Sequence, residues 1–200
     1  RAYIPDAVDF SKAMPVPVTQ IEGSCVAYSV GYAARGYYAS FESGQKAGSK
    51  AYVPSVAYLH SKIRFTDDTC EDSGSNVARA MEFLLQENVP SENTMPADYM
   101  CKENILLASQ STFDFRISDF QYVAARLDKS RSIPRHEIDA IKQQLSQGHP
   151  VMFGMDLTVY PSYTEEGRVP TLLAYLKSGE IYLGSRDPRY NGTVPETRGH

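Results

Sequence analysis

The sequence has no tryptophan, only three cysteines, and neither a long apolar run nor a long basic run. No stretch approaches the roughly 18 consecutive apolar residues that a membrane-spanning helix needs, so we expect no membrane partner. A net charge of −4 without a basic cluster argues against a nucleic-acid partner. The chain also lacks His-x-x-x-His and Cys-x-x-Cys spacings, and we therefore expect no metal and no organic cofactor.

What remains is sufficient for a substantial core. The chain has 200 residues, of which 42% are hydrophobic and 22% charged, a size that fits one large domain or two small lobes sharing a cleft. Its 14 tyrosines supply most of the large amphipathic side chains. Because the chain opens with Arg1 rather than a methionine or a signal peptide, we expect a processed or trimmed form.

One cysteine lies where a helix is expected to begin. Apolar residues recur at spacings of three to four from this point, which predicts a helix from about residue 24 to 40: Val26, Val30, Ala33, Tyr37 and Phe41. Cys25 would lie in its first turn, where unpaired N–H groups and the positive end of the helix dipole favour a thiolate. A thiolate attacks carbonyl carbon, although a packed, inert thiol is the alternative interpretation.

The Gly23-Ser24-Cys25 segment, with Gln20 before it, resembles the active-site segment of papain-like cysteine peptidases. In that family the glutamine donates to the oxyanion, the cysteine is the nucleophile, and a distant histidine is the base. The resemblance implies a divergent, bacterial member, because Gln20 lies five residues before the cysteine rather than six and Val26 replaces the customary tryptophan.

The resemblance also implies an α+β fold of the papain-like two-lobe type. Residues 1–108 would form a helical lobe carrying the nucleophile, and residues 109–200 a β-barrel-like lobe carrying the histidine, with the active-site cleft between them. It further implies that the substrate contacts two segments. Gly23 and Ser24 lie directly before the nucleophile, and Gly74 and Ser75 lie directly before the helix predicted over 76–88. Glycine suits such a place, because a residue without bulk lets backbone pair with an extended peptide.

The remaining elements follow from periodicity and from helix start and stop signals. Helices are predicted from Pro54 through Ile63, over 76–88, and from Pro134 to Gly148. His60 is expected at the edge of the apolar face of the first of these helices, and Ser73 or Ser75 is expected to cap the second. Strands are predicted over 113–117, 150–155 and 181–183. Val16 and Val18, beside two prolines, are expected to point inward. A helical half followed by a strand-rich half is an α+β pattern.

If Cys25 is free, Cys70 and Cys101 remain as a possible pair, and counting alone leaves two free thiols equally open. The family resemblance implies a Cys70–Cys101 disulfide, and with it a secreted or periplasmic location. Such a bridge would close a loop of about thirty residues and contribute roughly 3–4 kcal/mol.

Four histidines compete for the role of base. His136 is expected in the first turn of a helix, where the dipole disfavours imidazolium, His149 in a connection, and His60 in the same lobe as the cysteine. His200 remains, and the Gly199-His200 pair resembles the start of the strand that carries the family's histidine. The family continues with further strands and an asparagine that this sequence does not include, so we expect either a truncated chain or a native chain that continues beyond this sequence.

The resemblance therefore implies a thiol endopeptidase, released from a propeptide and acting as a monomer on peptide or protein substrates. Cys25 would attack the scissile carbonyl, Gln20 would stabilise the oxyanion, and His200 would shuttle the proton. Two alternatives stay open. The chain could be an inactive papain-fold protein that uses its cleft for binding, or a deamidase or transamidase using the same Cys-His pair.

Overall fold

The computed structural model describes residues 4–21, 23–65, 69–70, 73–102, 113–124 and 134–154, together with four short strands in the last fifty residues. The chain divides into two compact units, Arg1–Met152 and Phe153–His200, and each is described by itself. The predicted lobe boundary at residue 108 lies outside the described residues.

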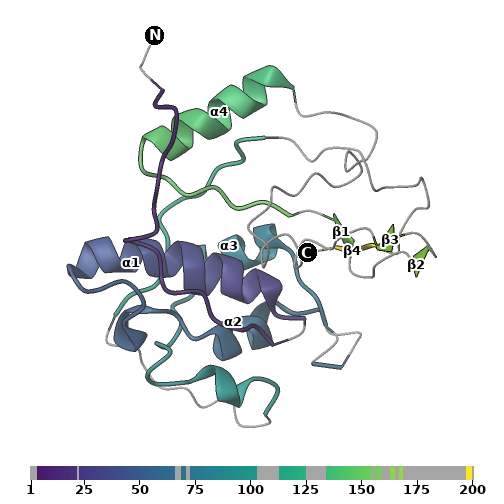
Figure 1. The fold of residues 1–200 in the computed structure, drawn as a ribbon. Helices are drawn as coiled ribbons and strands as arrows, with labels where there is room; N and C mark the ends of the chain where they lie inside the picture. Colours follow the sequence, from purple (N-terminus) through teal and green to yellow (C-terminus); the bar gives the residue numbers. More distant parts are fainter. Residues whose placement is uncertain are drawn as a thin grey trace. The chain divides into compact units, whose positions relative to one another are not determined.

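One long helix occupies the centre of the first unit (Figure 1). Its first two residues are Cys25 and Val26; a π-helix, η1 (Ala27–Arg35), follows and continues into α1 (Gly36–Ser43). The N–H of Gly36 bonds to the carbonyl of Gly31, five residues earlier, which is the π-helical pattern. Gly44, with φ of 65°, ends the helix in the left-handed conformation. The predicted central helix is confirmed.

The other predicted helices of this unit are also confirmed. They are α2 (Val56–Ile63), α3 (Val77–Gln86) and α4 (Arg135–Ser146). A short 3₁₀-helix, η2 (Lys50–Tyr52), precedes α2, and another, η3 (Ala97–Tyr99), lies between α3 and α4 in the chain. The cap of α3 is Asn76, whose side chain accepts from the N–H of Arg79. The predicted caps Ser73 and Ser75 are wrong, because their hydroxyls donate to the carbonyls of Phe65 and Ile63.

The core of the first unit lies where the central helix meets α2 and α3. Fully buried side chains from these elements and from the segment after residue 112 make it up: Val30, Leu59, Ile63, Leu84 and Phe115. A Cβ added to Gly31 would lie 2.8 Å from Cδ2 of Leu59, so the absence of a side chain at Gly31 lets η1 approach α2 closely. Burial of each large aliphatic side chain contributes about 1.5–3 kcal/mol.

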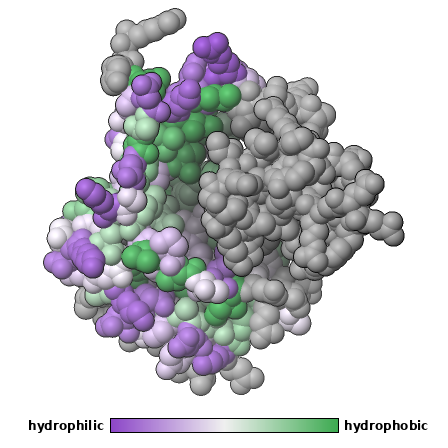
Figure 2. All heavy atoms as spheres, viewed as in Figure 1, coloured by the Kyte–Doolittle hydropathy of each residue, from purple (hydrophilic) through white to green (hydrophobic). Residues whose placement is uncertain are grey.

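The segment before the central helix packs through a proline rather than through its valines. Pro15 is buried, and its Cγ would lie 3.0 Å from a Cβ added to Gly36. Val16 and Val18 are 70% and 51% exposed, so the prediction that they point inward is wrong. The hydroxyl of Tyr32 donates to the carbonyl of Val16 at 2.8 Å. Figure 2 shows apolar residues exposed among polar ones on one face of the molecule.

The described strands are short and form two separate pairs. In the second unit β1 (Asp156–Thr158) pairs antiparallel with β4 (Thr197–Gly199), and β2 (Tyr163–Thr164) pairs antiparallel with β3 (Gly167–Arg168). In the part of the chain that the structure describes there is no barrel, and helix predominates. The predicted papain-like two-lobe α+β fold, with a β-barrel-like lobe, is therefore wrong.

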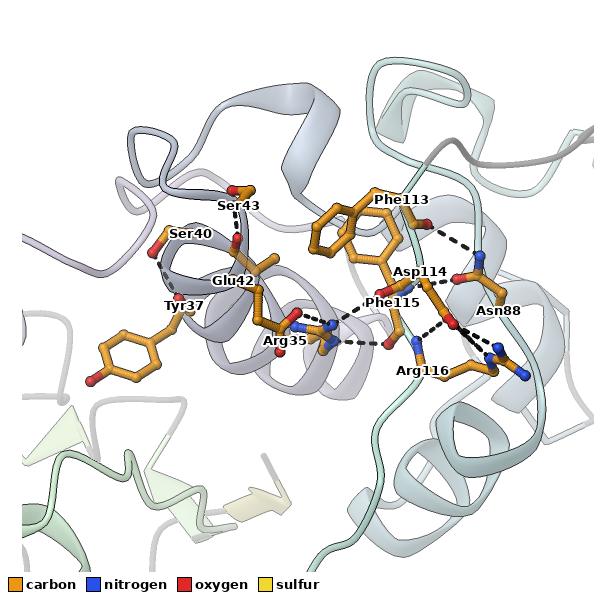
Figure 3. A network of polar contacts seen from close by, with 11 residues as sticks. Arg35, Tyr37, Ser40, Glu42, Ser43, Asn88, Phe113, Asp114, Phe115 and Arg116 are labelled. Carbon is orange, nitrogen blue, oxygen red and sulfur yellow. Dashed lines mark hydrogen bonds and ion pairs between the residues drawn. The ribbon is translucent and has the colours of Figure 1, made fainter.

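Residues 113–117 show why an alternating pattern did not become a strand. The side chain of Asn88 accepts from the N–H of Phe115 at 2.7 Å and donates to the carbonyl of Phe113 at 3.2 Å (Figure 3). The N–H of Ile117 donates to the carbonyl of Leu84 at 3.0 Å, in the last turn of α3 rather than in a neighbouring strand. An asparagine side chain therefore occupies backbone groups that a ladder would otherwise pair.

Arg35 completes the anchoring of this segment. Its Nε donates to the carbonyl of Phe115 at 2.9 Å, and a terminal nitrogen donates to the carbonyl of Asp114 at 3.0 Å and to the Glu42 carboxylate at 2.7 Å (Figure 3). The guanidinium is buried although it is charged. Buried charges need such partners, and Arg35 therefore fixes the 113–117 segment against the central helix.

The other two predicted strands have different outcomes. Residues 150–154 have no ladder partner among the described residues; Val151 and Met152 are half-buried, and Phe153 is exposed, so a buried strand is not formed there. Residues 181–183 lie outside the described residues.

Candidate active site

A sharp turn leads the chain into the central helix at Cys25. Gly23 has φ of 76°, a conformation that residues with a side chain rarely adopt, so glycine is the residue that suits this turn. Ser24 is buried, and its hydroxyl donates to the carbonyl of Ile21. Its own carbonyl accepts from the N–H of Tyr28 at 3.1 Å, which begins the helix. Cys25 thus occupies the first helical turn, as predicted.

Cys25 is the one cysteine of the three that is not in a disulfide. Its side chain is half-buried and packs against the edge of the core. In the described part of the chain, no hydrogen bond reaches its sulfur. The thiol is therefore neither bridged nor fully enclosed, and it remains available for chemistry.

The predicted substrate-binding residues differ in what their side chains do. The hydroxyls of Ser24 and Ser75 are used inside the protein, on the carbonyls of Ile21 and Ile63. Gly74 is half-buried, and a Cβ added to it would meet nothing within 4 Å. There is open space beside its backbone, although its carbonyl already accepts from the N–H of Phe65.

Gln20 and His200 are the other two residues predicted for the catalytic site. Gln20 is exposed, five residues before Cys25. His200 lies outside the described residues, so the predicted Cys25–His200 pair stays a prediction.

The three described histidines occupy different environments. His136 is exposed in the first turn of α4, as predicted, and His149 is exposed with Nδ1 3.0 Å from the hydroxyl of Tyr38. His60 is only 1% exposed, so its prediction as an edge or surface residue is wrong. It stands three and four residues from Ile63 and Val56, on the apolar face of α2, and this spacing was the signal for its burial.

His60 lies beside the disulfide. Cys70 and Cys101 are bonded, with 5.5 Å between their Cα atoms, which confirms the predicted pairing. Nε2 of His60 lies 3.0 Å from the carbonyl oxygen of Cys70. A ring nitrogen of His60 and the two sulfurs all lie within 4.8 Å of one another. Sequence reasoning missed this cluster, because residues 60, 70 and 101 form no recognised ligand spacing.

Glu92 is a second buried group that sequence reasoning missed. Its carboxylate accepts from the N–H of Ala97 at 2.7 Å and from the N–H of Val56 at 3.4 Å. Burial raises the pKa of this carboxyl, and the two backbone hydrogen bonds oppose that shift. Both oxygens are occupied at the starts of α2 and η3, so the role of Glu92 is to fix these two helices.

The environment of His60 predicts a pH-dependent stability. Burial lowers the pKa of His60, and the hydrogen bond to the carbonyl of Cys70 opposes the shift. Because the folded pKa lies below the unfolded value of about 6.5, the stabilisation is present above that pH and is lost as the pH falls through the folded pKa. We expect the free energy of unfolding to fall less steeply between about pH 7 and pH 5 in His60→Gln than in the unsubstituted chain.

Urea unfolding at several pH values measures this difference, and His149→Gln, at an exposed histidine, is the matched control. A His60→Gln curve parallel to that of the unsubstituted chain would show that His60 does not contribute to the pH dependence.

Comparison with models of known protein families, with curated proteins and with solved structures finds no match. A functional assignment therefore rests on the residues of this chain. Within the described residues, no helix has both the length and the apolar character to cross a membrane.

Proposed function

We propose that the chain is a thiol peptidase with Cys25 as the nucleophile. The observation that carries the proposal is the position of one free, half-buried thiol in the first turn of the central helix, two residues after the left-handed Gly23. The positive end of the helix faces this turn, and its N–H groups have no partner within the helix. A thiol at this position is the nucleophile that we propose for attack on a carbonyl carbon.

In the proposed reaction, the sulfur of Cys25 attacks the scissile carbonyl carbon to form a tetrahedral intermediate. The backbone N–H of Cys25 and the amide of Gln20 donate to the oxyanion. His200 protonates the leaving amine, and water then hydrolyses the thioester. The barrel-like lobe is not required for this chemistry, because nucleophile-and-histidine pairs occur on unrelated folds.

The same proposal includes a secreted or periplasmic location and action as a monomer on peptide or protein substrates. The Cys70–Cys101 disulfide supports the location, since such bonds persist mainly in oxidising compartments.

Labelling with a peptidyl epoxide tests the proposal. An activated Cys25 is expected to form one covalent adduct per chain, detected by intact mass and located by peptide mapping, and Cys25→Ser is expected to form none. A protein that uses this surface only for binding has no reason to activate its thiol. Absence of an adduct on the folded chain would contradict the proposal.

Product analysis with a peptide library separates hydrolysis from the other acyl transfers. Cleaved peptide backbones are expected from a peptidase. Release of ammonia from side-chain amides without backbone cleavage would instead identify a deamidase or a transamidase.

Gln20 provides a second test of the mechanism. If its amide donates to the oxyanion, Gln20→Ala is expected to lower kcat by about 10²–10³-fold with little change in KM, because the lost hydrogen bond forms only in the transition state. Steady-state kinetics on a fluorogenic peptide measures both constants. Thr19→Ala, at the neighbouring exposed position, is the matched control. An unchanged kcat in Gln20→Ala would remove Gln20 from the site.

A further inference from the structure

The cluster of His60, Cys70 and Cys101 is independent of Cys25 and contains the donor set of a zinc site. One imidazole nitrogen and two sulfurs lie within 4.8 Å of one another. Zinc is bound by cysteine sulfur at about 2.3 Å and by histidine nitrogen at about 2.0–2.1 Å, so only small movements separate this arrangement from coordination. The sulfurs are now bonded to each other, and they become metal ligands only when that bond is broken.

The hydrogen bond of His60 defines its tautomer. The carbonyl oxygen of Cys70 can only accept, so the nitrogen beside it, Nε2, carries the proton. Nδ1 then carries no proton and has a free lone pair. This nitrogen is buried, and it has no hydrogen-bond partner. A metal-bound histidine characteristically donates its other N–H to a carbonyl oxygen. The ring is therefore already in the protonation state of a ligand.

The two cysteines are placed differently from the histidine. Both are half-buried rather than enclosed, which leaves the bond open to a reductant. Cys101 has φ of 61°, an uncommon conformation for a residue with a side chain, and such backbone is found preferentially at functional sites. His60 is held on α2, so one ligand stays in position when the two sulfurs separate.

We propose that reduction of the Cys70–Cys101 disulfide by a dithiol converts this cluster into a three-residue zinc site, with His60, Cys70 and Cys101 as ligands. The dithiol gives two electrons and two protons to the disulfide, which becomes two thiols, and the reductant closes to its own cyclic disulfide. Zn²⁺ then displaces the two thiol protons to solvent and takes the imidazole lone pair as its third donor. Water fills the fourth position.

The donor set fits zinc better than harder cations. Thiolate and imidazole favour zinc, whereas calcium and magnesium select oxygen ligands. The site would therefore exchange one cross-link for another, with the oxidised chain held by a disulfide and the reduced chain held by a metal.

Zinc binding to the folded chain tests the proposal, in a Cys25→Ser background that removes the third thiol. The chain is reduced with dithiothreitol, freed of reductant by anaerobic gel filtration, and titrated with zinc in competition with a chromophoric chelator. We expect one tightly bound zinc per reduced chain, none in the oxidised chain, and a zinc-dependent rise in the unfolding temperature of the reduced chain. His60→Gln is expected to weaken binding by more than about 100-fold, and His149→Gln is expected to leave it unchanged.

Cobalt provides a readout that needs no substitution at His60. Co²⁺ added to the reduced chain is expected to give the intense visible bands of a four-coordinate ion together with thiolate charge transfer. Three results would each overturn the proposal. They are equal zinc affinity in the oxidised and reduced chains, equal zinc affinity in the reduced chain with and without the His60→Gln substitution, and a weak six-coordinate cobalt spectrum. Zinc binding without any gain in unfolding temperature would also overturn it, because the metal would then bind unfolded thiols.

Discussion

Replacing Cys25 with alanine is expected to lower kcat/KM for peptide hydrolysis by about 10⁴-fold or more, because loss of a nucleophile removes the covalent route altogether. Cys25→Ser is expected to be similarly impaired, since a serine hydroxyl is a weaker nucleophile than a cysteine sulfur. A fluorogenic peptide assay at matched protein concentration measures the effect.

The loss should be separable from misfolding. Cys25 is half-buried at the edge of the core, so its truncation removes little packing, and the unfolding temperature should change only slightly. Ser29→Ala, at a half-buried position on the next turn of the same helix, serves as the matched control and should retain activity. Peptide hydrolysis by Cys25→Ala at the rate of the unsubstituted chain would exclude Cys25 as the nucleophile.

Replacing Phe115 with alanine is expected to destabilise the chain by about 3–5 kcal/mol, the largest effect on stability that we predict. The side chain is 0% exposed, and its ring centroid lies 4.9 Å from that of Phe113 and 5.9 Å from the guanidinium carbon of Arg35. Truncation leaves a cavity and loosens the backbone that Arg35 and Asn88 hold. Urea unfolding monitored by circular dichroism measures the free energy of unfolding.

Tyr122→Ala is the matched control for this substitution. It removes an aromatic ring of similar size a few residues further along the chain, but Tyr122 is 75% exposed, so the expected change is within about 0.5 kcal/mol. Equal effects of the two substitutions would show that the 113–117 segment does not form part of the core.

The helices could be predicted because their determinants are local. The spacing of Val56, Leu59 and Ile63 is that of one helical face, and a left-handed glycine ends the central helix at Gly44. These signals need only neighbouring residues. The Cys70–Cys101 bridge was predicted from a resemblance, and the structure confirms the pairing although the predicted fold is wrong.

The strand prediction over 113–117 failed because its determinants are distant. Alternation describes which side chains are buried, not what pairs with the backbone. Here the partners come from Arg35, 79 and 80 residues away along the chain from the two carbonyls it contacts, and from the side chain of Asn88. No local pattern indicates that an arginine and an asparagine will take the place of neighbouring strands.

The candidate site was predictable only in part. The position of Cys25 follows from the helix pattern, and the structure places it in the first turn. Residues that lie far apart in the sequence and meet only in the folded chain show no periodic pattern that would predict their contact. His60 beside the disulfide is one example, because no local pattern indicates that residues 60, 70 and 101 will lie together.

Trapping the acyl-enzyme tests the central claim most directly. The chain is mixed with a slowly hydrolysed peptide ester, quenched in acid during turnover, and analysed by intact mass and peptide mapping. We predict a mass increase equal to the acyl group on the peptide that contains Cys25, and none in Cys25→Ser. Turnover with no acyl group on Cys25, or with the acyl group on another residue, would contradict the assignment of Cys25 as the nucleophile.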